Sequence, residues 1–500
     1  MPVAANFIKK IPAEFCCLLS GMVMPLAFAP FNFWPVSIAA TAILFYLSVD
    51  RTPRQGFLCG YLFGIGMFGA GVNWLHISIN QFGGMSLTGS LLVTMVLVLF
   101  LALYPALTIL GGKRFFSSRG STVYLFSLAV LWILFEWLRA WLFTGFPWLQ
   151  IGYAHADSPL SGLAPVTGIY GTGLAVTVSS CLLVLLARRG TIKRFTVLLV
   201  LLCLWLASWV LGRMDWVGPS GSDISVALIQ GGIPQDMKWQ PQFRRQGFEL
   251  YLELSEPFWN RDLIVWPETA LPVFLSHSNA YLEEIETLRQ RGGGSLLLGI
   301  PVDDPDTGQY FNSALLLGSE LFVYHKRHLV PFGEYLPLKF LLGRILNFLE
   351  IPMSDFTPGK SVSPVFDTGV FRVGISICYE ATFGSEIIQA MPDAEFLINI
   401  SNDAWFGDSL APHQHLQMAR MRALETSRFM LRATNTGITA IIDNKGRVIR
   451  RAEQFNPAAI SDRISLYHGL TPYAATGDIP VIMLCMLVLL LLRIRKTEII

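Results

Sequence analysis

The chain has 500 residues, of which 53% are hydrophobic and 14% charged, and its formal net charge at neutral pH is +2. So low a charged fraction is unusual for a soluble protein. The small net charge says little about partners, and no nucleic-acid partner is predicted. The apolar residues are concentrated in 11–211 and 479–492, which indicates a membrane protein with a polar region between two apolar ones.

Eight apolar stretches approach the length of about 20 residues that crosses a bilayer. They lie at 12–30, 33–49, 57–78, 85–111, 122–143, 165–186, 194–211 and 477–493. Lys9 and Lys10 make the first resemble a signal peptide, but no small-x-small cleavage site closes it, so we expect a retained span. The sequence predicts a polytopic α-helical domain of seven spans over 1–212, with an eighth span and a cytoplasmic tail in 477–500.

The distribution of Lys and Arg predicts the orientation of these spans. The basic clusters near the span ends are Lys9/Lys10, Arg51/Arg54, Lys113/Arg114/Arg119, Arg188/Arg189/Lys193/Arg194 and Arg493/Arg495/Lys496. Most of them fit an arrangement with both termini cytoplasmic, although Arg51/Arg54 and the 188–194 cluster do not both fit strict alternation. The segment 213–476 then lies on the opposite side, which in a bacterium is the periplasm, and the membrane is the inner one.

Two charged residues, Glu136 and Arg139, lie three positions apart inside the fifth stretch. They are interpreted either as a self-neutralising pair on one helix face or as a contact for a lipid head group. The aromatic loop 145–153 that follows is expected to anchor the protein at the outer interface or to form the floor of a lipid-entry site.

From Asp223 onward, short β-type runs alternate with helical periodicity, which predicts one layered α/β domain over 213–476. The expected strands are 224–230, 263–266, 295–300, 313–317, 321–324, 371–377, 396–400, 430–433 and 439–442. The expected helices are 242–254, 280–291, 383–390 and 413–427.

Three motifs of this region carry chemically useful residues at strand ends. Glu268 follows a strand in Val-Trp-Pro-Glu-Thr-Ala, Lys326 follows another in His-Lys-Arg-His, and Cys378 ends the run Val-Gly-Ile-Ser-Ile-Cys. Of the seven cysteines, only Cys378 lies outside the apolar stretches. An acid, a cation and a thiol fit nucleophilic catalysis, with the ammonium expected to lower the thiol pKa. Each residue alone also fits an ordinary role in packing, capping or a solvated loop.

The three motifs together resemble the nitrilase superfamily, whose Glu-Lys-Cys triad lies on an αββα sandwich. With the flanking spans, and with 135–139, 145–148 and 401–407, the chain resembles the apolipoprotein N-acyltransferase family over residues 7–495. The resemblance implies that Glu268 is the general base, Lys326 the oxyanion partner and Cys378 the nucleophile. It also implies supporting or substrate-binding roles for Glu334, Tyr379, Glu380, Trp239, Asn402, Trp405 and Phe406.

The activity that the resemblance implies is a ping-pong transfer. An acyl chain moves from a membrane phospholipid to a Cys378 thioester, and then to the α-amine of the N-terminal diacylglyceryl-cysteine of a lipoprotein. No cofactor is expected, and no metal is expected because His325/His328 and His413/His415 lack further ligands at suitable spacing. A membrane-tethered nitrilase-type amidohydrolase and a transporter with a periplasmic binding domain remain the alternatives.

The last expectation concerns Leu336–Ile351, where apolar residues recur at helical spacing between Lys339, Arg344 and Glu350. This is an amphipathic helix too short to span a bilayer. It is interpreted either as a helix packed on the domain core or as an arm that rests on the outer leaflet beside the active site.

Overall fold

The computed structural model describes residues 12–188, 193–335, 355–360 and 363–494. The chain forms two compact units. The helical unit contains residues up to 76, 87–214 and the segment from 476 onward, and the catalytic unit contains 77–86 and 215–475. The catalytic unit therefore includes a short segment that the sequence analysis assigned to the membrane domain. Leu336–Ile351 lies outside the described residues.

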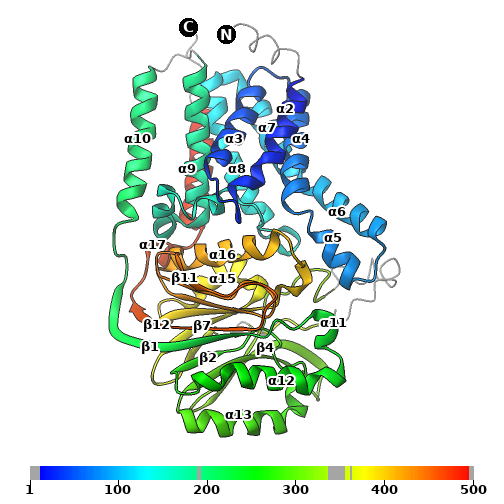
Figure 1. Ribbon diagram of the computed structural model, residues 1–500. Helices are drawn as coiled ribbons and strands as arrows, with labels where there is room; N and C mark the ends of the chain where they lie inside the picture. The colour runs from blue at the N-terminus through cyan, green and yellow to red at the C-terminus, as the bar shows by residue number, and fades with distance from the viewer. Residues whose placement is uncertain (1–11, 189–192, 336–354, 361–362, 495–500) are drawn as a thin grey trace. The chain divides into compact units, whose positions relative to one another are not determined.

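The helical unit is built from apolar helices joined by short turns (Figure 1). They are α2 (Ala13–Val23), α3 (Pro35–Ser48), α4 (Pro53–Gly71), α6 (Leu87–Leu101), α7 (Leu103–Phe115), α8 (Ser121–Arg139), α9 (Ala164–Ala187), α10 (Arg194–Leu211) and α18 (Ile479–Ile494). In the part of the chain that the structure describes, four helical segments are long and apolar enough to cross a membrane, namely Leu87–Phe115, Ser121–Arg139, Pro159–Ala187 and Arg194–Leu211. A fifth joins Pro53–Gly71 to Leu75–Phe82 through a bend of 57°.

The remaining three predicted spans coincide with apolar helices of 10–17 residues, at Ala13–Ala27, Pro35–Ser48 and Ile479–Ile494. Every predicted stretch is therefore helical in the described chain. Length and composition support four or five crossings, and the count of eight stays a prediction.

Glycines allow neighbouring helices of this unit to approach closely. A Cβ atom on Gly21 of α2 would lie 2.1 Å from the carbonyl oxygen of Phe63, and one on Gly66 of α4 would lie 2.3 Å from that of Leu18. Lipid tails provide no hydrophobic drive for helix association, so close backbone packing at small residues takes its place. Substitution of either glycine by alanine forces α2 and α4 apart.

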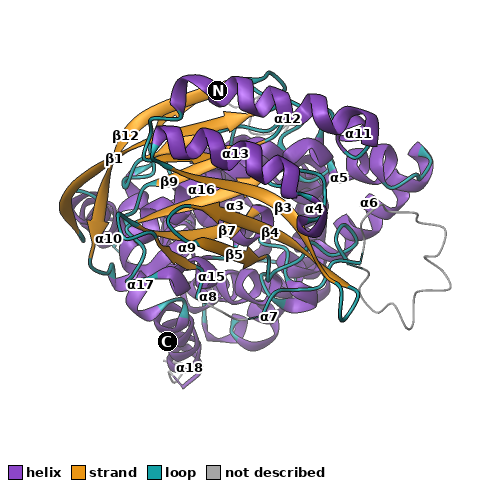
Figure 2. Ribbon diagram, turned by 90° about the horizontal axis from the view of Figure 1, so that it is seen from below, coloured by secondary structure: helices purple, strands orange, loops and turns teal. Residues whose placement is uncertain are grey.

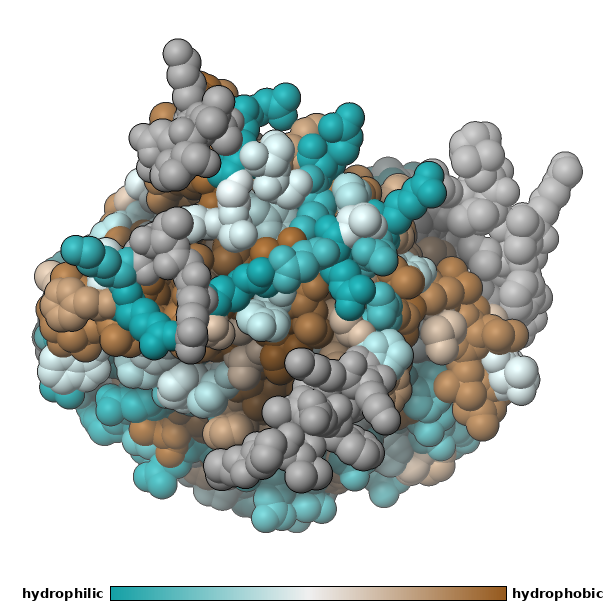
Figure 3. Space-filling view, turned by 90° about the horizontal axis from the view of Figure 1, so that it is seen from above, coloured by the Kyte–Doolittle hydropathy of each residue, from teal (hydrophilic) through white to brown (hydrophobic). Residues whose placement is uncertain are grey.

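Charged side chains gather at one end of the helical unit, which Figure 3 views directly. Three contacts at this end join residues that are far apart in the sequence. Arg188 Nη2 lies 2.8 Å from Asp50 Oδ1, Lys113 Nζ donates to the Val49 carbonyl at 2.5 Å, and the Arg493 guanidinium lies 5.5 Å from the centre of the Phe115 ring. Arg188 contacts Asp50, so the residues near 51 and 188 lie close together in the described chain, and the fit of both clusters to strict alternation stays a prediction.

Glu136 and Arg139 are both buried and form hydrogen bonds with backbone groups of the loop that follows α8. Glu136 Oε1 accepts from the Trp132 indole at 3.0 Å and the Ile151 N–H at 2.9 Å. Arg139 Nη1 donates to the carbonyls of Phe146 at 2.8 Å and Trp148 at 2.6 Å. Their described partners are protein groups, which favours the structural interpretation over a head-group contact.

The catalytic unit contains two six-stranded sheets. The first has the order β12 (Ala458–His468), β1 (Gly218–Gln230), β2 (Leu263–Val265), β3 (Ser295–Asp304), β4 (Gln309–Leu317), β5 (Leu321–His325). The second has the order β11 (Val448–Arg451), β10 (Ala440–Ile442), β9 (Met430–Thr434), β8 (Phe396–Ser401), β7 (Arg372–Ile377), β6 (Val365–Asp367). The central pairs β1–β2–β3 and β7–β8–β9 are parallel, and the outer pairs are antiparallel.

Successive side chains of a strand point to opposite faces of its sheet, and both faces of each sheet are buried. The catalytic unit therefore has four layers, two sheets in the middle and helices on either side. Val226 and Leu228 of β1 share a buried cluster with Ile375 and Ile377 of β7, so these faces of the two sheets pack on each other. The outer face of the first sheet is covered by α12 (Pro241–Ser255) and α13 (Asn279–Gly292), and that of the second by α16 (Ala411–Thr426). Figures 1 and 2 show this αββα sandwich.

The sequence analysis missed β6, β11 and β12. The long strand β12 pairs antiparallel with β1 along its length, yet only Ile464 and Leu466 of it are buried. It is an edge strand whose polar sequence lacks clean alternation, so a hydrophobic pattern does not detect it.

Candidate active site

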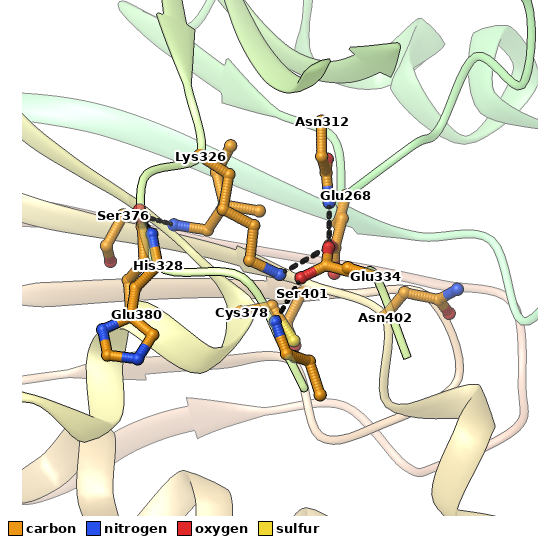
Figure 4. A network of polar contacts seen from close by, with 12 residues as sticks. Glu268, Asn312, Lys326, His328, Glu334, Ser376, Cys378, Glu380, Ser401 and Asn402 are labelled. Carbon is orange, nitrogen blue, oxygen red and sulfur yellow. Dashed lines mark hydrogen bonds and ion pairs between the residues drawn. The ribbon is translucent and has the colours of Figure 1, made fainter. Parts of the chain in front are cut away.

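The three motif residues meet although they come from strands in both sheets. Glu268 follows β2, Lys326 follows β5 and Cys378 follows β7. Figure 4 shows the three side chains pointing toward one another. All three are buried, with 6%, 1% and 9% of their surface exposed. A buried acid, ammonium and thiol that face one another are an arrangement that covalent catalysis can use.

Lys326 lies between two carboxylates. Its Nζ is 3.6 Å from Glu268 Oε1 and 2.8 Å from Glu334 Oε1. Asn312 Nδ2 donates to the same two oxygens, at 2.7 Å and 2.9 Å. Glu334 Oε2 accepts from the Val330 N–H at 2.8 Å, so Glu334 holds the lysine and its own loop in place.

The local charges keep Lys326 protonated. Burial alone lowers the pKa of Lys326, but Glu334 and Glu268 outweigh burial and raise it above the ordinary lysine value. The ammonium therefore persists at neutral pH. It can stabilise a negative oxygen but cannot act as a base.

The pKa of the Cys378 thiol is raised, whereas the sequence analysis expected Lys326 to lower it. Burial, followed by the charge of Glu268, raises the pKa of Cys378 to about 12, and Lys326 offsets this only in part. The expectation is wrong because it included the ammonium but neither the burial of the thiol nor the carboxylate beside it. The resting group is a thiol, so its reaction needs a base.

Cys378 adopts a backbone conformation that is rare for a residue with a side chain, with φ of +52°. Such a conformation costs roughly 1–3 kcal/mol and persists only where its surroundings enforce it. Glu380 is one enforcing group: its Oε2 accepts from the Ile377 N–H at 2.7 Å, and its Oε1 accepts from the Arg327 N–H at 2.7 Å and the Tyr324 hydroxyl at 2.9 Å. Glu380 thus ties the cysteine turn to the loop after Lys326.

The other residues predicted for the site lie around this centre. Tyr379 is buried and packs edge-to-face on Phe383, with ring centroids 5.1 Å apart. Asn402 Nδ2 donates to Gln235 Oε1 at 2.8 Å, so it binds protein rather than pointing at the thiol. Trp239 is half-buried and caps the C-terminus of α11 (Gln235–Lys238).

Trp405 and Phe406 lie half-buried in the turn after β8. The Trp405 carbonyl accepts from Ser78 Oγ at 2.6 Å, and the Trp405 ring lies 5.2 Å from that of Phe82. These partners belong to the short segment 77–86 that the catalytic unit takes from the span region. Trp405 therefore connects the turn after β8 with residues more than 300 positions earlier in the chain.

Sequence reasoning missed several buried polar residues at the site. Asn312 bridges the carboxylates, and Lys238 Nζ donates to the backbone carbonyl of Glu268 at 2.9 Å. Burial lowers the pKa of Lys238 to about 8, against the raising effect of Glu268. Asn399 and Arg432 lie in the middle of apolar strands, and a polar residue at such a position was the signal that could have identified them.

Cys378, Asp403 and His415 are grouped closely enough to hold a metal ion. However, Arg432 Nη2 donates to Asp403 Oδ2 at 2.8 Å, so a guanidinium already neutralises the carboxylate. Burial raises the pKa of Asp403, but Arg432 and His415 outweigh burial and hold it below its usual range. The group is an ion-pair network behind the thiol.

Fold and site together define a carbon–nitrogen hydrolase unit joined to an apolar helical unit. The Carbon-nitrogen hydrolase family model matches residues 225–466, and the model for the apolipoprotein N-acyltransferase N-terminal domain matches residues 20–182. An apolipoprotein N-acyltransferase of Methylococcus capsulatus is 41% identical over 95% of this chain and 94% of its own, and one of Nitrosomonas europaea is 42% identical over 94% and 95%. The chain belongs to the apolipoprotein N-acyltransferase family. Among solved structures, Saccharomyces cerevisiae Nit3 matches half of this chain and 92% of its own at 17% identity and a TM-score of 0.39.

Proposed function

We propose that this protein transfers an acyl chain from a membrane phospholipid to the N-terminal α-amine of a diacylglyceryl-apolipoprotein. The observation that carries the proposal is the convergence of Glu268, Lys326 and Cys378 in a chain of the apolipoprotein N-acyltransferase family. The curated relatives are named for this activity over nearly the whole chain.

In the first half-reaction, Glu268 accepts the proton of the Cys378 thiol, and the sulfur attacks the ester carbonyl of the phospholipid. The raised pKa of Cys378 supports this order, because the thiolate forms only as the proton leaves. The oxyanion of the tetrahedral intermediate faces the Lys326 ammonium. Collapse breaks the ester C–O bond, and Glu268 returns the proton to the departing lysophospholipid oxygen.

In the second half-reaction, the α-amine of the lipoprotein attacks the Cys378 thioester carbonyl while Glu268 accepts its proton. Collapse breaks the C–S bond and forms the amide. The proton on Glu268 then returns to the sulfur, which restores the starting thiol. Glu334 holds the Lys326 ammonium in position in both steps, consistent with the 2.8 Å ion pair between them.

The proposed location is the bacterial inner membrane, with eight spans, both termini cytoplasmic and the catalytic unit in the periplasm. The basic side chains at one end of the helical unit support a cytoplasmic position for that end. Helix α10 runs from Arg194 to Leu211, and the chain enters the catalytic unit at Asp215.

A membrane-tethered amidohydrolase uses the same three residues but releases a free acid. The names of the relatives do not favour it, and a hydrolase of small amides needs no apolar helical unit. Transport is also disfavoured, because the described spans carry few ionisable residues.

Mass analysis of the purified protein after incubation with phosphatidylethanolamine micelles tests the proposal. We expect an acyl adduct on the Cys378 peptide, which is discharged by a synthetic diacylglyceryl-cysteine peptide with formation of its N-acyl product. Release of free fatty acid without peptide acylation favours the hydrolase. Absence of any adduct on Cys378 refutes the proposal.

A further inference from the structure

A row of polar side chains crosses the parallel part of the second sheet directly behind the nucleophile. Ser376 of β7 pairs in register with Asn399 of β8, and Asn399 pairs with Arg432 of β9. The flanking residues Ile375 and Ile377 belong to the core between the sheets. Because side chains alternate along a strand, the polar row faces the opposite side, toward α16.

His415 of α16 completes this row and reaches the backbone of the nucleophile. Its Nε2 lies 3.2 Å from the Cys378 carbonyl oxygen, and Asn399 Nδ2 lies 3.3 Å from the same oxygen. A carbonyl oxygen only accepts, so both nitrogens are donors here. The carbonyl of Cys378 is therefore held by two side chains from different elements.

The remaining contacts fix the orientation of the imidazole. Its Nδ1 lies 3.0 Å from Asp403 Oδ1 and 3.0 Å from Arg432 Nη2. The neutral ring accepts from Arg432 at Nδ1 and carries its hydrogen on Nε2, while the imidazolium carries hydrogens on both nitrogens. In both states Nε2 donates to Cys378. Arg432 Nη1 also donates to Asn399 Oδ1 at 2.5 Å, which orients the second donor.

Burying such a network of charged side chains costs free energy. Asp403, His415 and Arg432 are each no more than 1% exposed, and removing charges from water costs several kcal/mol per ion unless the partners compensate. A buried apolar cluster of the same size would stabilise the fold without that penalty. The network directs two donors at one backbone atom, the carbonyl oxygen of a residue with φ of +52°. The network also contacts neighbouring serines: Asn399 Nδ2 lies 3.1 Å from Ser376 Oγ, and Ser401 Oγ donates to Asp403 Oδ1 at 3.0 Å.

The consequence for chemistry follows from the planarity of the peptide bond. In the trans peptide between Cys378 and Tyr379, the carbonyl and the N–H point in opposite directions. Two donors that hold the carbonyl on the α16 side therefore direct the Tyr379 N–H to the other side. A backbone N–H that follows a nucleophile is suitably placed to bind the oxyanion of an acyl intermediate.

We infer that His415, held by Asp403 and Arg432, is a positioning residue: it sets the Cys378–Tyr379 peptide plane so that the Tyr379 N–H stabilises the oxyanion together with Lys326. The inference rests on the proposed function only in taking Cys378 as the acylated nucleophile. It predicts a defect in attack on carbonyl carbon and no defect in reactions of the thiol that form no oxyanion.

Two small reagents for the same thiol separate these reactions in the purified full-length chain. Acylation of Cys378 by p-nitrophenyl acetate passes through an oxyanion, whereas alkylation by iodoacetamide does not. We expect His415→Phe, which removes the donor but keeps a planar ring, to slow acylation about 100-fold. Alkylation, followed by mass analysis of the Cys378 peptide, should stay within about threefold of the wild type. His415→Gln, which restores a donor, should recover a large part of the acylation rate.

The matched control is His413→Phe. His413 lies two residues earlier on α16, about 200° around the helix, and is half-buried. His413→Phe should leave the rates of acylation and alkylation unchanged.

Three outcomes overturn the inference: equal loss of both reactions in His415→Phe, unchanged acylation in His415→Phe, or failure of His415→Gln to exceed His415→Phe. The proposed function fails separately, if wild-type protein forms no thioester with phosphatidylethanolamine while p-nitrophenyl acetate still acylates Cys378.

Discussion

Glu268 and Glu334 share one hydrogen-bond donor, because Oε1 of each accepts from Asn312 Nδ2, at 2.7 Å and 2.9 Å. Two carboxylates this close repel one another, and Lys326 between them offsets the repulsion. One of the pair is therefore able to exchange a proton with the thiol while the other keeps the ammonium in place. The predictions below separate these roles.

Cys378→Ser and Cys378→Ala are expected to abolish acyl transfer while the protein still folds and inserts. Cys378 is the only cysteine of the catalytic unit, and a serine hydroxyl is a much weaker nucleophile at neutral pH. Mass analysis after incubation with phospholipid should detect no adduct. Cys203→Ser, at an exposed cysteine of α10, is the control and should keep full activity. Near-normal transfer by Cys378→Ala would rule out the nucleophile assignment.

Glu268→Gln is expected to separate acyl transfer from thiol reactivity. The acyl-enzyme should not form, because the general base is lost. Alkylation of Cys378 by iodoacetamide at pH 8 should instead become about tenfold faster, since Glu268 raises the thiol pKa and its removal leaves only Glu334 to balance the charge of Lys326. Glu320→Gln, in the exposed turn before β5, should change neither rate. Slower alkylation in Glu268→Gln would contradict the charge assignment.

The pH dependence of alkylation follows from the raised thiol pKa. In the wild type, Cys378 has a pKa of about 12, so its thiolate fraction rises roughly tenfold per pH unit between pH 7 and 10. The alkylation rate of the Cys378 peptide should rise in parallel, with no plateau in this range. A plateau below pH 9 would mean that the thiol is more acidic than its burial implies.

Lys326→Ala is expected to block acyl-enzyme formation, by about 10²–10³-fold in rate, because the oxyanion loses its cation. It should also destabilise the fold by about 3–5 kcal/mol, since Glu268 and Glu334 keep buried charges but lose the cation between them. Denaturation and acylation assays measure the two effects. Lys360→Ala, at an exposed lysine, serves as the control. An adduct that accumulates at the normal rate in Lys326→Ala would refute the role.

Asn312→Leu is expected to lower the acylation rate about tenfold or more without unfolding the protein. The substitution keeps the branching of the side chain but removes a donor to two carboxylates, and a hydrogen bond to a charged group contributes about 1.5–3 kcal/mol. The control is Asn279→Leu, at an exposed asparagine at the start of α13. Unchanged kinetics would show that Lys326 alone holds the two acids.

Much of the architecture was predictable because it depends on local pattern. Apolar runs identified the long helices of the described span region, although 85–111 was predicted as one span and contains both α6 and α7. Short β-type runs identified nine of the twelve described strands, since burial on one or two faces leaves a direct trace in the order of residues. The edge strand β12 was missed because only two of its eleven residues are buried, so it carries no alternating apolar pattern. The segment 77–86 was assigned to a span by composition, but its contacts with Trp405 place it in the catalytic unit.

The sequence by itself predicted which residues carry the chemistry: a strand-end glutamate, lysine and cysteine in motifs that resemble one superfamily. Only the tertiary structure decided their electrostatic state. Burial and the approach of Glu268 raise the thiol pKa where the lysine alone predicted a decrease, because these effects depend on distance and dielectric rather than on sequence spacing. The same holds for Asn312 and His415, which lie 66 and 37 positions from Cys378 and reach the site only through strand register and helix packing.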